Sequence, residues 1–242
     1  MKSRAEIVDE AIEIAGEDAD VLWALAINSM PMRRAYFETI SERTPRQVVK
    51  CLARLANVGL LAATDGLLFS IDSERVSQLI VERIPEGRGI ELASQSLEFG
   101  NTCDDLPEMF FVDHALRSDR PTQAAERLVA QLPEHPAEDS PVAREVIDAL
   151  NRVLKALWAD HVTDALFLSV GKALIQHGPT SIKPRAWREL LAALEAHPEA
   201  DDALRAALAQ ADNQFKKRRA AERRVAAESL SEVVAPVESE GD

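Results

Sequence analysis

Apolar residues in the first third of the chain recur at the three-to-four-residue spacing of amphipathic helices, in short stretches separated by polar residues. Residues 3–16 predict one helix, and residues 21–26 belong to a second, for which Asp18 or Asp20 is a candidate N-cap. Residues 32–40 predict a short third helix. We therefore expect this part of the chain to consist of short, closely spaced helices.

The best-defined helix of the sequence covers residues 45–58. Thr44 suits the N-cap, because its hydroxyl can accept a hydrogen bond from a free backbone N–H, and Pro45 suits the first helical position. Gly59 follows the last apolar residue, where helices commonly end.

A β-hairpin is predicted directly after this helix. Asp65-Gly66 lies between the apolar runs 60–63 and 67–71, and an Asp-Gly pair in that position favours a two-residue hairpin turn. A further helix over residues 73–84 would follow the hairpin.

The remaining patterns are helical throughout. Residues 85–89 contain one proline and two glycines around a charged pair, which indicates a domain boundary. Helices are expected within 90–132, 140–177 and 184–196, with a loop over 131–139, and a last helix after Pro198 that extends to about residue 231. The sequence thus predicts a domain at 1–84, an acidic, bundle-like helical domain at 85–210, and at 211–242 a basic helical extension with a disordered acidic tail.

Composition supports a mainly α-helical fold. Among 242 residues, glycine occurs 9 times and aromatic residues make up 5%, a balance that favours helix over an all-β fold. No apolar run approaches the roughly 20 residues of a membrane helix, and no signal peptide is recognisable. Two cysteines, Cys51 and Cys103, cannot form a disulfide framework, although redox sensing stays open. We expect a cytoplasmic protein that does not bind membranes.

The net charge of -13 is concentrated in the middle of the chain. Residues 85–210 carry 12 Lys/Arg and 21 Asp/Glu, whereas residues 1–84 carry 10 and 13. Acidic surface repels nucleic acid and anionic membranes. A DNA-binding surface is therefore expected only in the N-terminal third or in a local basic cluster near the end.

The helix over residues 45–58 has two chemically distinct faces, because consecutive residues turn by about 100° around a helix. One face is apolar and must pack against a core; it consists of Val48, Cys51, Leu52, Leu55 and Val58. The other carries cations and amides that can reach phosphates and base edges, namely Arg46, Gln47, Lys50, Arg54 and Asn57. The alternative is that these side chains only solvate an exposed helix face.

The order of elements over residues 18–84 resembles a winged helix-turn-helix domain with a small β-hairpin wing. Residues 44–61 are similar to the recognition helix and first wing strand of bacterial and archaeal regulators of the MarR and ArsR type. The resemblance implies a recognition helix in the major groove, a wing on the DNA backbone, and dimerisation through flanking helices. The residues that it would place against double-stranded DNA are Arg33, Arg34, Arg43, Thr44, Arg46, Gln47, Lys50 and Arg54.

The predicted wing departs from the pattern of a DNA-contacting hairpin. Residues 62–70 contain no Lys or Arg and one Asp, although phosphate contacts by cations supply much of the affinity for DNA. Winged-helix domains also serve as protein-docking modules, and the acidity of the chain suits that use.

A candidate basic arm lies in the last predicted helix. It consists of Lys216, Lys217, Arg218, Arg219, Arg223 and Arg224. Consecutive cations point all around a helix, so a solvated extension is the simpler interpretation; contact with nucleic acid or an acidic partner is the alternative.

No arrangement of residues indicates catalysis, a metal site or a cofactor. The five histidines lack zincin spacing, and the sequence has no P-loop and no nucleophile elbow. Asp104 and Asp105 with Glu108 could bind a hard cation, but an acidic loop that caps a helix is the better account. We expect a protein that is not an enzyme and uses no cofactor.

Two hypotheses follow for the function. The first is a homodimeric winged-helix DNA-binding protein, a transcriptional regulator with residues 45–58 as recognition helix. The second is an adaptor in a larger assembly, in which the winged helix and the acidic helical region dock protein partners.

Overall fold

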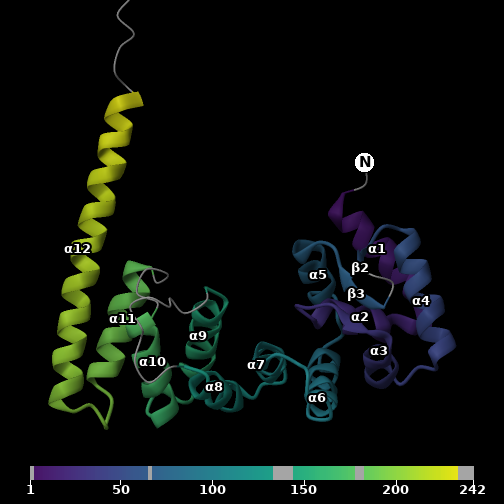
Figure 1. Cartoon of the computed structure of the whole chain (residues 1–242), viewed down its shortest axis with the longest axis horizontal. Coiled ribbons are helices and arrows are strands. Elements are labelled where there is room, and N and C mark those ends of the chain that lie inside the picture. Colours follow the sequence, from purple (N-terminus) through teal and green to yellow (C-terminus); the bar gives the residue numbers. More distant parts are fainter. Residues whose placement is uncertain (1–2, 65–66, 133–143, 178–182, 234–242) are drawn as a thin grey trace, which may run out of the picture. The chain divides into compact units, whose positions relative to one another are not determined.

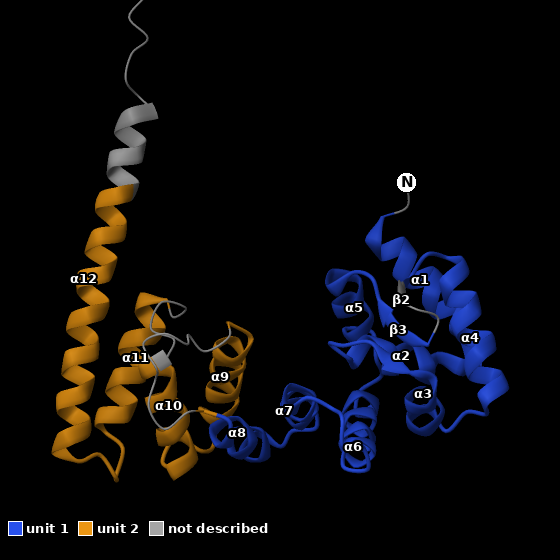
Figure 2. Ribbon diagram, in the orientation of Figure 1, with its two compact units in different colours: residues 1–131 blue, residues 132–242 orange. Residues whose placement is uncertain are grey.

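A computed structural model of the chain describes residues 3–64, 67–132, 144–177 and 183–233. The described residues are mainly helical and include a small antiparallel sheet, so the expected predominance of helix is confirmed (Figure 1). The chain divides into two compact units, Met1–Gln131 and Leu132–Asp242 (Figure 2). None of the described helices combines the length and the apolar character that a membrane span requires.

The first unit contains the helices predicted for the N-terminal third and three more. They are α1 (Arg4–Ala15), α2 (Ala19–Ile27), α3 (Arg34–Ser41), α4 (Pro45–Asn57), α5 (Glu74–Val81), α6 (Arg88–Gly100), α7 (Glu108–Arg117) and α8 (Pro121–Ala130), with a short 3-10 helix, η1, at Gly16–Asp18. Helices α1, α3 and α4 each bury one apolar face, whereas α2 is buried on nearly all sides; Val8, Leu22, Phe37 and Leu55 are all 0% exposed. The apolar pattern therefore predicted these helices correctly to within a few residues.

A three-stranded antiparallel sheet in the order β1-β3-β2 contacts α2, α3, α4 and α5. Strands β2 (Leu61–Thr64) and β3 (Leu68–Ile71) form the predicted hairpin, whose Asp65-Gly66 turn lies outside the described residues. Strand β1 (Met32–Arg33), which pairs with β3, was not predicted, because two residues are too short to show any periodicity.

The ends of α4 are fixed by local sequence. Thr44 Oγ1 accepts a hydrogen bond from the Gln47 N–H (3.4 Å), and Gln47 Oε1 accepts one from the Thr44 N–H (3.1 Å), which makes a capping box. At the other end Gly59 has φ +72°, and the N–H groups of Gly59 and Leu60 donate to carbonyls of the last turn (2.9 and 3.2 Å). These caps determine where the helix begins and ends.

Helices α6 and α7 attach to α2 and α3 through a buried polar network. The Tyr36 hydroxyl lies 2.7 Å from Ser96 Oγ and accepts a hydrogen bond from Asn28 Nδ2 (2.7 Å). His114 Nε2 lies 3.2 Å from Asn28 Oδ1. Because an amide oxygen can only accept, Nε2 carries the imidazole proton. Burial raises the pKa of Tyr36 to about 12 and lowers the pKa of His114 to about 3.

The division between the units therefore lies after Gln131. It does not lie at residues 85–89, where the proline and the two glycines suggested a domain boundary. Arg88, inside the expected linker, donates to Asp20 Oδ1 at 2.9 Å and so ties the start of α6 to α2. The expected domains 1–84 and 85–210 thus differ from the observed units, because non-local polar contacts cross the turn at residue 85.

The second unit contains α9 (Arg144–Leu157), α10 (Ala165–His177), α11 (Pro184–Glu195) and α12 (Asp202–Val233). The helical stretch expected within 140–177 consists of two helices, α9 and α10, with residues 158–164 between them. The predicted start of that stretch at 140–143, most of the loop at 131–139 and the last residues of the expected tail, 236–242, lie outside the described residues. Gly171 allows α10 and α11 to pack closely, since a Cβ there would meet the Leu194 side chain at 2.6 Å. Trp187 stacks on Phe215 with ring centroids 4.7 Å apart and joins α11 to α12.

Candidate functional site

The outward face of α4 presents two cations with an apolar residue between them. Arg46, Val49 and Lys50 are exposed, and Val49 has 47% of its surface accessible. The opposite face of the helix is buried in the core, as its pattern predicted, through Val48, Cys51, Leu52 and Leu55. The structure therefore separates the two faces of this helix as the sequence indicated.

An open hollow of about 480 Å³ lies along this outward face. Its lining comes from the start of α3 and from the exposed side of α4, and consists of Arg34, Pro45, Arg46, Val49, Lys50 and Ala53. Among the residues that the structure describes, Arg46 and Lys50 have no ion-pair partner. Their charges are available to an anionic ligand.

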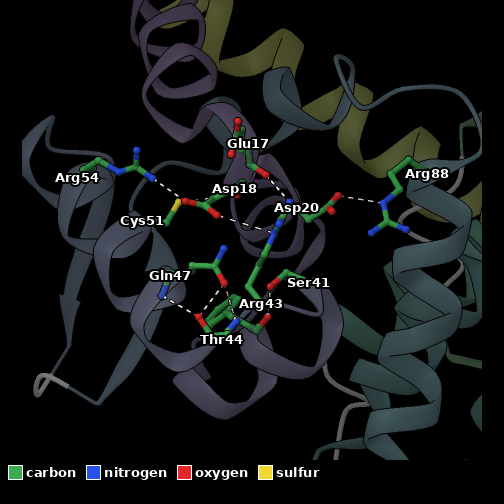
Figure 3. Close-up of polar contacts among 11 residues, drawn as sticks. Glu17, Asp18, Asp20, Ser41, Arg43, Thr44, Gln47, Cys51, Arg54 and Arg88 are labelled. Atoms are coloured by element: carbon green, nitrogen blue, oxygen red, sulfur yellow. Dashed lines mark hydrogen bonds and ion pairs between the residues drawn. The ribbon is translucent and has the colours of Figure 1, made fainter.

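Two of the predicted DNA-facing arginines point elsewhere. Arg54 Nη2 lies 2.8 Å from Asp18 Oδ2, and Arg43 Nε lies 3.8 Å from Asp18 Oδ1 (Figure 3). Arg43 also donates to the backbone carbonyl of Glu17. The carboxylate of Asp18 thus holds both guanidinium groups against the 3-10 helix that follows α1.

The other predicted residues divide between local structure and solvent. Arg34 makes an ion pair with Glu38 (2.6 Å), and Thr44 and Gln47 are joined in the capping box, where Thr44 Oγ1 donates to Gln47 Oε1 at 2.7 Å. Arg33 is exposed in β1. The structure therefore brings Arg46 and Lys50 together on one face and engages most of the remaining predicted residues in internal contacts.

Sequence reasoning missed the role of Asp18 and the exposure of Val49. Asp18 was one of two candidates for the N-cap of α2, beside Asp20, but its side chain makes no capping hydrogen bond and bonds to Arg54 instead. The two residues are 36 positions apart, so no local pattern could have paired them. The signal for Val49 was present in the helical wheel, since at about 100° per residue it lies within about 60° of the exposed Arg46 and Ala53 and more than about 100° from Leu55 at the centre of the buried face.

Cys51 belongs to the core side of α4 and is 0% exposed. Burial raises the pKa of its thiol to about 11, and the neighbouring Arg54 only partly opposes that effect. Because the thiolate is the reactive form of cysteine, this site is poorly suited to redox chemistry at neutral pH.

The candidate basic arm extends along α12 beyond its contact with α11. Lys216 pairs with Asp212 (2.5 Å) and Arg219 with Glu222 (3.0 Å), both within the helix. All six cations of the arm are exposed. In-helix pairs of this kind are typical of a solvated helix surface.

Metal-binding geometry is not found among the described residues, where no three or more His, Cys, Asp or Glu side chains gather around one point. Of the acidic group near residue 104, Glu108 is bonded to Arg127 at 2.9 Å.

Comparison with protein-family models, with curated proteins and with solved structures found no match to this chain. Inference about function therefore depends on the geometry of the chain itself.

Proposed function

We propose that the first unit is a winged helix-turn-helix module that binds double-stranded DNA through α4, and that the protein is a homodimeric transcriptional regulator. The order of elements supports this proposal. A short helix, a tight turn and a capped amphipathic helix are followed by an antiparallel hairpin, and β1 precedes the short helix and pairs with β3. In helix-turn-helix proteins the second helix of the pair lies in the major groove.

The observation that carries the proposal is the outward face of α4. Arg46 and Lys50 are exposed one turn apart and have no ion-pair partner among the described residues. An arginine can bond to the O6 and N7 atoms of guanine, and a lysine can neutralise a phosphate. Since Arg43 and Arg54 are held by Asp18, Arg46 and Lys50 are the cations of α4 through which DNA would be bound.

A second candidate function is protein docking, and a specific observation favours it. Val49 is exposed between the two cations of α4, and Leu67 beside the hairpin turn has 74% of its surface accessible. A helix face that alternates cations with apolar side chains also suits an acidic amphipathic partner.

A fluorescence-anisotropy titration tests the proposal. The probes are a duplex from the region upstream of the protein's own coding sequence and a scrambled duplex, each measured at two salt concentrations. The proposed function predicts tighter binding to the upstream duplex and a steep loss of affinity with salt, because bound phosphates release counterions. Absence of binding at low salt would reject DNA binding and favour docking, to be followed by a pull-down with the same variants.

The matched variants make the test specific for α4. The double substitution Arg46→Glu with Lys50→Glu should weaken binding by about 100-fold or more. The control, Arg75→Glu with Arg120→Glu, changes the net charge equally at exposed positions of α5 and of the turn before α8, and should bind almost normally. Equal losses in the two double variants would show that binding follows net charge and not α4.

A further inference from the structure

The second unit holds a hollow of about 460 Å³ lined by residues of α9, α10 and α11. Its floor is apolar and buried, since Leu154, Leu174 and Leu190 are 6%, 0% and 1% exposed. The half-buried ring of Trp158 lines it as well. A volume of this size lies within the range of small-molecule sites in proteins.

Positive charge gathers at the mouth of this hollow. Lys155 and Lys183 line it and are both exposed. Glu189 is the carboxylate among the described lining residues, and Arg185 Nε holds its Oε1 at 2.8 Å. Neither lysine has an ion-pair partner in the described part of the chain. The hollow thus combines an apolar floor with two uncompensated ammonium groups.

We propose that this hollow binds a small amphipathic carboxylate. The alkyl or aryl body would lie on the leucine floor and against Trp158, where it is removed from water. The carboxylate would remain at the mouth, where Lys155 and Lys183 donate charge-assisted hydrogen bonds. Lysine suits this arrangement because its methylene stem can follow the apolar wall while its ammonium group stays in water. The site does not depend on DNA binding by the first unit.

Isothermal titration calorimetry of the full chain tests the proposal with two probes of equal chain length, octanoate and 1-octanol. Both can fill the apolar floor, but only octanoate carries the negative charge. We expect octanoate to bind at one site per chain and about tenfold more tightly than 1-octanol, because hydrogen bonds to charged groups contribute roughly that factor.

Three variants locate the site. Lys155→Met with Lys183→Met replaces each lysine by an uncharged, unbranched apolar side chain of similar length and should reduce octanoate affinity to that of 1-octanol. Lys172→Met removes a lysine of α10 that is not among the described lining residues, and should change nothing. Ala186→Trp places a large ring into the hollow from an exposed position of α11, and should abolish binding of both probes. Thermal unfolding by circular dichroism verifies that each variant is folded.

Three results would overturn the proposal. The first is no binding of octanoate. The second is equal affinity for octanoate and 1-octanol, which would mean an apolar hollow without a role for the lysines. The third is octanoate binding that survives Ala186→Trp in a folded protein, which would locate the ligand elsewhere.

Discussion

The hollow on α4 and the hollow of the second unit present similar charges over different floors. Their volumes are about 480 and 460 Å³. Each is lined by two cations without an ion-pair partner among the described residues, Arg46 and Lys50 in the first and Lys155 and Lys183 in the second. The first is lined by exposed residues of α4 and of the start of α3, whereas the second has buried leucines of three helices at its base.

Charge alone therefore does not define the partner. Cations on the outside of a single helix can follow an extended polyanion, since such a helix fits the major groove of DNA. Cations around a buried apolar floor can instead hold the charged end of a small molecule whose body is desolvated. The two proposals therefore differ because buried apolar side chains lie beneath the lysines of the second hollow, whereas exposed side chains line the first.

When DNA binding and octanoate binding are both measured on the variants of each hollow, we expect each variant to lose only one of the two activities. Arg46→Glu with Lys50→Glu should weaken duplex binding by about 100-fold or more, because two attractive contacts become repulsive. The same variant should keep its octanoate affinity within about twofold, because the two hollows share no lining residue and substitutions at independent sites are usually additive. Ala186→Trp should show the reverse pattern, and anisotropy and calorimetry on the same preparations measure both. Loss of both activities in either variant would contradict separate sites.

The buried histidine of the first unit predicts a pH effect on the stability of that unit. Burial lowers the pKa of His114 from 6.5 to about 3, with Arg117 lowering it further and Asp113 opposing both. Above pH 6.5 the folded and unfolded chains are both neutral at this residue. Below it, the unfolded chain binds a proton that the folded chain does not, so stability falls, by about 2 kcal/mol at pH 5.

Urea unfolding of the isolated residues 1–131 at pH 7.5 and pH 5 measures this loss. Trp23 is the tryptophan of this segment, and its fluorescence follows the unfolding. His114→Gln can still donate to Asn28 and should remove most of the pH dependence while lowering stability at pH 7.5. An unchanged pH dependence in that variant would mean that another group is responsible.

Sequence predicted the elements whose causes are local. The helix α4 was predicted because Thr44, Pro45 and Gly59 lie next to it in the chain, and the hairpin because its turn residues lie between two apolar runs. Of the candidate site, the exposure of Arg46 and Lys50 followed from helical geometry alone.

The parts that sequence did not predict depend on distant residues. Asp18 and Arg54 pair across 36 positions, and no spacing rule connects them. The network that binds Asn28, Tyr36 and His114 likewise joins segments across the turn at residue 85, whose proline and glycines resemble a linker. Polar residues in a sequence do not reveal whether they are buried together.

Removing one positive charge at a time distinguishes Arg54, which is paired with Asp18, from Lys50, which has no ion-pair partner among the described residues. Arg54→Gln breaks the bond to the largely buried carboxylate of Asp18 and should cost about 1 kcal/mol of stability, because that ion pair is partly solvated. It should leave the salt dependence of DNA binding unchanged.

Lys50→Gln should have little effect on stability. It should reduce the slope of log affinity against log salt concentration by about 1, as expected for one lost phosphate contact. Chemical denaturation measures the stability of both variants, and anisotropy at several salt concentrations measures the salt dependence of their DNA binding. A reduced salt dependence in Arg54→Gln would mean that Arg54 leaves Asp18 to contact DNA.

The smallest expected effect separates DNA binding from protein docking at the same helix face. Val49→Ser replaces the exposed apolar residue between Arg46 and Lys50 without changing any charge. Because phosphate contacts dominate DNA affinity, the variant should bind the duplex within about threefold of the original protein. A docking partner would instead bury this side chain at the centre of its interface, where removing an apolar contact is costly. Anisotropy measures the duplex affinity. A Val49→Ser variant that binds DNA normally but no longer captures a protein partner would identify α4 as a docking helix.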